Sequence, residues 1–96
     1  MKFEIAPKST EIQANWDDAR LYCFSLNIDG KTGWRLPTVG ELNYMYNLNL
    51  IKPANWWSSE MTNNHIKYIS PYRKVRYITT GYLFGVCPVR DLKDNS

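Results

Sequence analysis

One segment constrains the fold of this chain more than any other: residues 33–42, Gly-Trp-Arg-Leu-Pro-Thr-Val-Gly-Glu-Leu. Its first half alternates a tryptophan and a leucine with an arginine, the pattern of a half-buried extended stretch. Pro37 ends that pattern, and Thr38 followed by Glu41 forms a capping box, which opens a helix. The segment therefore predicts an extended stretch that leads directly into a helix packed against a sheet.

This helix is expected from about residue 39 to 48, with Leu42, Met45 and Tyr46 directed inward. A second helix is expected before it, opened by Asn15 as N-cap and ended by Gly30. Its apolar face recurs at three- and four-residue steps and comprises Trp16, Ala19, Cys23 and Leu26.

Short extended segments surround the helices. A first strand is expected at residues 3–5. After Pro53 the spacing of the apolar residues changes from that of a helix to that of an extended strand. The later strands are expected at residues 56–59, 65–70, 74–80 and 82–89. Two helices and an antiparallel sheet of short strands predict an α+β domain.

At 96 residues, the chain is long enough for one small domain, which we take as residues 1–96 with a frayed tail at 94–96. Its 14 aromatic residues, 4 Trp, 7 Tyr and 3 Phe, supply much of the area to be buried. We expect one core that joins both helices to the sheet: Trp16, Ala19, Leu26, Trp34, Leu36, Leu42, Trp57 and Val89.

Four blocks of residues carry a family resemblance. They are Trp16…Ala19…Tyr22-Cys23…Leu26, then Gly33-Trp34-Arg35-Leu36-Pro37-Thr38…Glu41-Leu42, then Trp57-Ser58-Ser59, and last Val86-Cys87-Pro88-Val89-Arg90. In this order they resemble the Lcl C-terminal domain family of bacterial and phage proteins, over residues 16–91. The resemblance implies a compact C-type-lectin-like fold and a ligand-binding scaffold, sometimes for glycans. Residues 59–86 are short for such a domain, and Cys87 stands where the family often has an arginine.

The resemblance also implies roles for Cys23 and Cys87, because lectin-like folds commonly join the first helix and the last strand by a disulfide. Two states follow: a disulfide, or two adjacent, reduced and buried thiols. The chain starts without a signal peptide, which favours the reduced state and a cytoplasmic location.

The chain lacks the motifs of several functional classes. Calcium-dependent sugar sites need converging oxygens, but Lys52-Pro53-Ala54-Asn55 carries no acid, and Asp91 and Asp94 have no evident partners. Two cysteines and a distant His65 lack the spacing of metal ligands. No nucleophile–base pair or phosphate loop is present, so we expect neither enzyme activity, nor a cofactor, nor a bound metal. Arg35 is expected to pair with Glu41 or Glu60, or to be a surface charge.

Residues 65–77 combine basic and aromatic side chains. They suggest a binding site at Tyr72, Arg73, Lys74 and Arg76, and Trp56 is added as an exposed ring because Trp57 points inward. Such residues suit a protein interface or an anionic polymer, either a sulfated glycan or a nucleic acid. They also suit the solvated edge of a hairpin.

The function expected from the sequence is a non-enzymatic protein–protein interaction module that binds and modulates a host or cellular protein, encoded by a phage or a mobile element. Two alternatives remain: an anionic-polymer-binding domain, and a structural subunit of a larger assembly. No apolar run approaches the length of a membrane span, and the net charge of +3 permits an acidic partner without requiring one.

Overall fold

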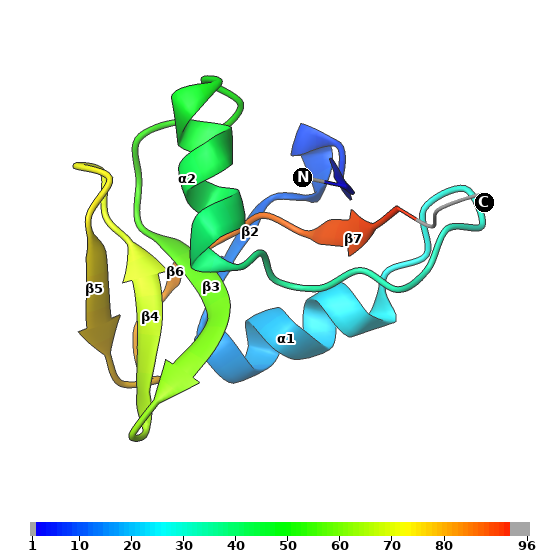
Figure 1. Cartoon of the computed structure of the whole chain (residues 1–96). Coiled ribbons are helices and arrows are strands. Elements are labelled where there is room, and N and C mark those ends of the chain that lie inside the picture. Colours follow the sequence, from blue (N-terminus) through cyan, green and yellow to red (C-terminus); the bar gives the residue numbers. More distant parts are fainter. Residues whose placement is uncertain (1, 93–96) are drawn as a thin grey trace.

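The computed structural model describes residues 2–92, which form two helices, a short 3-10 helix and seven strands (Figure 1). In chain order the elements are β1 (Phe3–Ile5), η1 (Lys8–Thr10), β2 (Ile12–Ala14), α1 (Trp16–Ser25), α2 (Val39–Asn47), β3 (Trp56–Thr62), β4 (His65–Ile69), β5 (Val75–Ile78), β6 (Phe84–Val86) and β7 (Val89–Asp91). The predicted α+β class is confirmed. The predicted tail at 94–96 lies outside the described residues.

Two sheets organise the chain. The larger has the order β2-β6-β3-β4-β5, and all of its pairings are antiparallel except the single parallel bridge between Trp56 and Gly85. The smaller sheet pairs β1 with β7, with Phe3 opposite Asp91. The larger sheet therefore has two edges, β2 and β5.

Local signals set both helices. Asn15 accepts a hydrogen bond from the Asp18 amide and caps α1. The capping box of Thr38 and Glu41 is present at α2. The expected end of the first helix at Gly30 is wrong: α1 stops at Ser25, and Gly30 instead sits with positive φ in a tight turn closed by the Ile28–Lys31 bridge.

Two other expectations about the strands are corrected. The single strand expected at 82–89 is two, because Pro88 cannot donate to a ladder and its carbonyl accepts the Ala6 amide, which draws the chain away to β1. Strand β2 was not expected, because it is defined by pairing with β6 far along the chain, with Ile12 opposite Val86.

The hydrophobic interior forms two clusters, and the expectation of one common core is wrong. The first cluster lies on the α1 side and contains Ala6, Ala14, Trp16, Ala19, Cys23, Trp34, Leu36, Trp57, Ile66 and Val86. The second lies on the α2 side and contains Leu42, Met45, Tyr46, Ile51, Trp56, Ile69, Cys87 and Val89. The physical reason is that the helices cover opposite faces of the larger sheet, so successive residues of β3 point into different clusters.

The tryptophans predicted to be structural are buried in the first cluster: Trp16, Trp34 and Trp57. Each indole donates to a backbone carbonyl, of Ser58, Lys31 and Ala14 respectively. Pro37 is also buried, and its carbonyl accepts the Ser59 amide at 2.8 Å. These contacts join the segment around Pro37 to β3.

Candidate functional site

Four of the five predicted binding residues lie on one supersecondary unit, the basic hairpin, which consists of β4, its turn and β5 (residues 65–78). They are Tyr72, Arg73, Lys74 and Arg76, whereas Trp56 lies on β3. The Arg73 amide donates to the Ser70 carbonyl at 2.9 Å, and the Ser70 amide donates to the Lys74 carbonyl at 3.0 Å. This is a three-residue hairpin loop of the type that ends in a left-handed residue. Here that residue is Arg73, with φ 63°.

Arg73 has a left-handed backbone conformation, which is usually adopted by glycine, asparagine or aspartate. Among the described residues, the other non-glycine positions with positive φ are all asparagine or aspartate: Asp29, Asn49, Asn63 and Asn64. Their short polar side chains tolerate this region, whereas longer side chains are strained in it. The Arg73 guanidinium lies 6.0 Å from the centroid of the Tyr46 ring on α2, a contact at the outer limit of a cation–π interaction.

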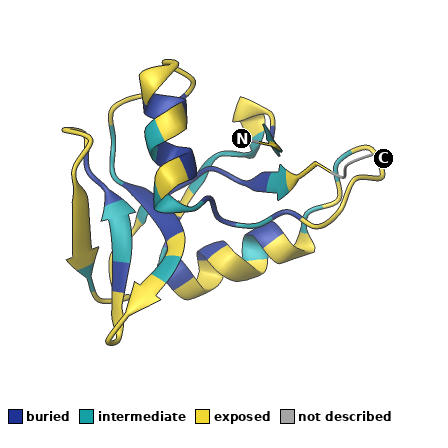
Figure 2. Ribbon diagram, in the orientation of Figure 1, coloured by how far each residue is buried: buried dark blue, intermediate teal, exposed yellow. Residues whose placement is uncertain are grey.

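The basic hairpin is exposed along its outer strand. Figure 2 shows β5 as exposed over most of its length, whereas β3 and β4 have buried segments. Tyr72 at the turn is 80% exposed and Tyr77 on β5 is 57% exposed. Two tyrosines and three exposed cations (Arg73, Lys74 and Arg76) therefore face solvent on one hairpin.

The side chains of the basic hairpin do not share one face. Arg76 is paired with Tyr68, which packs on the α1-side cluster, so its side chain lies on that face. Tyr77 is paired with Lys67 and lies on the α2 face, where the Lys67 ammonium is 5.9 Å from its ring centroid. The Lys67 ammonium also lies 3.5 Å from a carboxylate oxygen of Glu60, so the two side chains form an ion pair.

The expectation that Trp56 is an exposed ring is wrong, because only 2% of it is accessible. It does point away from Trp57, as expected, but the face that it points to is covered by α2 and the α2–β3 loop. Its indole donates to the Lys52 carbonyl at 2.9 Å. Gly85 packs directly against its six-membered ring.

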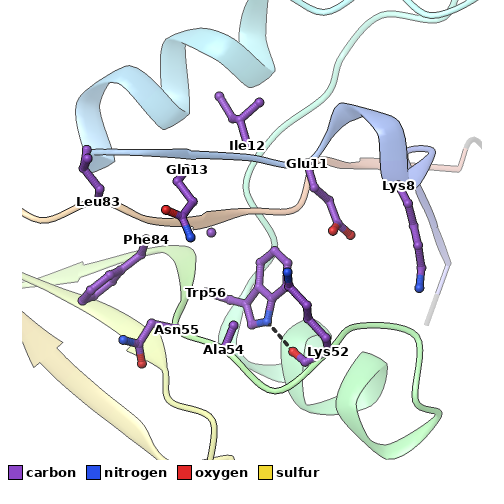
Figure 3. A pocket seen from close by; sticks show the side chains of 11 residues that line it. Lys8, Glu11, Ile12, Gln13, Lys52, Ala54, Asn55, Trp56, Leu83 and Phe84 are labelled. Atoms are coloured by element: carbon purple, nitrogen blue, oxygen red, sulfur yellow. Dashed lines mark hydrogen bonds between the residues drawn. The ribbon is translucent and has the colours of Figure 1, made fainter.

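Trp56 nevertheless borders a pocket of about 420 Å³, here called the β2–β6 pocket. Three stretches of the chain line it: one from η1 to β2, one from the α2–β3 loop to the start of β3, and one that leads into β6 (Figure 3). Its lining residues are Lys8, Glu11, Ile12, Gln13, Lys52, Ala54, Asn55, Trp56, Leu83, Phe84 and Gly85.

The lining of the β2–β6 pocket contains both aromatic and polar side chains. Figure 3 shows the Glu11 carboxylate and the Gln13 amide directed to the same side of β2 as the Trp56 indole. Lys8 and Lys52 bring positive charge to the same rim. This pocket was not predicted, because its residues are spread over more than 70 positions and β2 was not expected.

Arg35 belongs to an ion-pair cluster that supports the fold. Its guanidinium donates to both Glu41 oxygens at 2.7 and 2.8 Å, and to Asp91 at 2.6 Å. The predicted pair with Glu41 is confirmed, and the expectation that Asp91 has no partner is wrong; Asp94 lies outside the described residues. Burial raises the pKa of Glu41, but hydrogen bonds from Arg35 and the Thr38 backbone outweigh it, so this pKa lies below 4.5.

Both cysteines are free and buried. Burial raises the pKa of Cys23 and of Cys87 to about 12. The Glu11 carboxylate and Cys23 add to the rise at Cys87, whereas Lys8 opposes it. Thiols with such a pKa are protonated at neutral pH and are poor nucleophiles.

The remaining polar candidates have structural partners. The Ser58 hydroxyl donates to the Lys67 carbonyl and accepts the Glu60 amide, as expected of a residue that bonds the backbone. His65 Nδ1 lies 3.0 Å from the Asn63 carbonyl. Across residues 2–92, no three His, Cys, Asp or Glu side chains are grouped so that they could hold a metal ion.

No helix among the described residues has the length and apolar character that a membrane crossing requires. Comparisons with protein families, with curated protein sequences and with solved structures find no match to this chain. The geometry of its own residues is therefore the basis for any function assigned to it.

Proposed function

We propose that this chain is a non-enzymatic binding protein that recognises another protein through the basic hairpin. The observation that carries the proposal is the hairpin tip, where Tyr72 is largely exposed and Arg73 is held in a conformation that suits glycine. A left-handed arginine costs the fold roughly 1 kcal/mol. Residues kept at such a cost are concentrated at functional sites.

The chemistry of the basic hairpin suits a protein partner. Tyrosine and arginine are the residue types most often found as interface anchors, because they add large contact areas and directional hydrogen bonds. Tyr72 and Arg73 lie exposed in the turn, and Arg76 lies exposed on β5. An acidic surface of a host or cellular protein would complement the charge of this unit.

The distribution of cations favours a protein over an anionic polymer. A polymer is held by a continuous track of cations that neutralise successive phosphates or sulfates. Arg76 lies on the α1 face, whereas Arg73 lies near Tyr46 on the α2 side, and Lys67 is paired with Glu60. The basic residues are therefore divided between the two faces of the hairpin.

We also propose that the scaffold is a reduced C-type-lectin-like domain of the Lcl type. Residues from the four blocks of the resemblance support this, because Trp16, Trp34, Leu36 and Trp57 pack in one cluster and Val86 joins them. In such a scaffold the shortened stretch between residues 59 and 86 includes the basic hairpin and the loop that follows it.

The proposed function is tested by affinity capture with the immobilised protein, followed by mass spectrometry. The parent is compared with a charge-reversed hairpin variant (Arg73→Glu, Lys74→Glu and Arg76→Glu). A control variant reverses the same number of exposed cations elsewhere (Lys8→Glu, Arg20→Glu and Lys52→Glu). We expect one stoichiometric protein with the parent and the control, and its loss with the hairpin variant.

A third variant, Arg73→Gly, separates binding from folding. Glycine relieves the left-handed strain, so the free energy of unfolding should rise by about 1 kcal/mol while the partner binds more weakly. The proposal is refuted if the charge-reversed hairpin variant keeps every interaction of the parent. It is also refuted if the captured material is lost on nuclease or glycosidase treatment, because the ligand is then a polymer.

A further inference from the structure

We infer that the partner is bound by strand addition: an extended segment that alternates acidic and apolar residues pairs antiparallel with β5. This inference rests on the proposed function, since it specifies how the basic hairpin would hold a protein. Among residues 2–92, β5 has β4 on one side and no strand on the other, so it is an edge of the five-stranded sheet. Figure 1 shows it at the outer margin of the molecule.

The register identifies which backbone groups of β5 face outward. In an antiparallel ladder, hydrogen-bonded pairs alternate with pairs that are not bonded to each other. The Ser70 amide donates to the Lys74 carbonyl, so the Tyr68–Arg76 pair, two steps along, is also of the bonded kind. Val75 and Tyr77 are therefore the residues whose N–H and C=O groups point away from β4.

The side chains along β5 divide by face. Val75 and Tyr77 lie on the α2 face and are exposed to 39% and 57%. Arg76 lies on the α1 face. Lys74 precedes β5 and is joined to Ser70 across the hairpin, so strand alternation assigns it to the same face as Arg76. An incoming strand thus meets an apolar and aromatic row on one face and a basic row on the other.

The apolar row and the basic row together determine which kind of strand could pair with β5. Residues directly opposite each other in adjacent strands have their side chains about 5 Å apart, close enough for charges to attract or repel. A second copy of β5 would place Lys74 and Arg76 beside their own counterparts, which is repulsive. A strand with Glu or Asp on one face and Val, Ile or an aromatic on the other complements both rows at once.

The inference is tested with the full chain and a synthetic probe, a capped peptide of about eight residues that alternates glutamate and valine. Binding is followed by NMR on the ¹⁵N-labelled protein. We expect shifts and slowed hydrogen exchange centred on the Val75 and Tyr77 amides. A peptide of the same composition with its glutamates and valines in separate blocks should bind at least about tenfold more weakly, as should a lysine–valine peptide.

N-methylation of the probe tests strand pairing without altering the protein. In antiparallel addition the bonded partners of Val75 and Tyr77 are the probe residues on the same face, which are the valines. N-methyl groups on alternate valines should therefore abolish binding, and N-methyl groups on the glutamates should leave it nearly unchanged. Equal effects of the two modifications would overturn the inference.

A matched pair of protein variants gives a second test. Val75→Pro removes an outward N–H and no bond of the β4–β5 ladder, a position where an edge strand tolerates proline. Val75→Ala removes the side chain and keeps the N–H. We expect the proline variant to lose probe binding and the alanine variant to retain most of it, and equal losses would contradict strand addition.

The two proposals fail in different ways. If the charge-reversed hairpin variant loses the captured protein while the alternating and block peptides bind alike, the basic hairpin is a protein site that works through side chains alone. The strand-addition inference is then wrong and the proposed function stands.

Discussion

Gly85 is the position where the smallest possible substitution should have a large effect. A Cβ atom there would lie 2.7 and 2.8 Å from two carbons of the Trp56 six-membered ring, and 3.2 Å from the Asn55 carbonyl oxygen. Carbon atoms in contact prefer about 3.5–4.0 Å, so the ring would have to retreat by about 1 Å. It has little room to do so, because Trp56 is buried and its indole is tied to Lys52.

Overpacking of a well-packed core costs about 1–3 kcal/mol. We place Gly85→Ala near the upper end of that range, because both close neighbours are constrained. For a small domain this is a considerable part of a total stability of about 5–15 kcal/mol. Urea denaturation followed by far-UV circular dichroism should therefore show a lower midpoint with an unchanged slope.

Gly81→Ala is the matched control, since no heavy atom lies within 4 Å of a Cβ added there. It should leave stability unchanged or raise it slightly. Trp56→Leu removes the ring, so adding Gly85→Ala to that variant should cost much less than in the parent. A Gly85→Ala protein that unfolds at the same urea concentration as the parent would refute the packing described for Trp56.

Three further predictions concern the interior and its ionisable groups. Trp57→Ala should lower the free energy of unfolding by about 3–5 kcal/mol in the same assay, because the ring is fully buried and its indole donates to Ala14. The lowered pKa of Glu41 adds stability above pH 4.5 that is lost as the pH falls through the folded value, so Glu41→Gln should flatten the acid limb of a stability–pH curve. Native Cys23 and Cys87, with pKa values of about 12, should resist iodoacetamide at pH 8 and react once the protein is unfolded, as mass spectrometry would show.

The features that were predictable from the sequence depend on neighbours in the chain. The Thr38–Glu41 capping box needs four residues, and it placed the start of α2 correctly. The hairpin turn at Asn63-Asn64 is equally local, because asparagine tolerates the positive φ that the turn requires. Such elements carry their own signals.

The features that could not be predicted from the sequence depend on which helix covers which face of the larger sheet. The direction of Trp56 relative to Trp57 follows from strand periodicity, but its burial depends on α2 lying across the opposite face from α1. The same limit applied to the candidate site. The basic and aromatic residues of the hairpin could be identified from the sequence. That Arg73 and Arg76 lie on different faces became clear only from the register of β4 and β5 and from the contact of Arg73 with Tyr46.

The pairing of β1 with β7 determines how the domain would respond to a mechanical load. Phe3 lies opposite Asp91 and Ile5 opposite Val89, so a force applied through the two ends of the described chain acts at the same end of this pair. The interstrand hydrogen bonds lie across the strands, and such a pull would open them one after another like a zipper. The Glu4–Arg90 ion pair would be an early point of resistance. Beyond it, the bridge between Arg35 and Val89 would transfer the load to the rest of the domain.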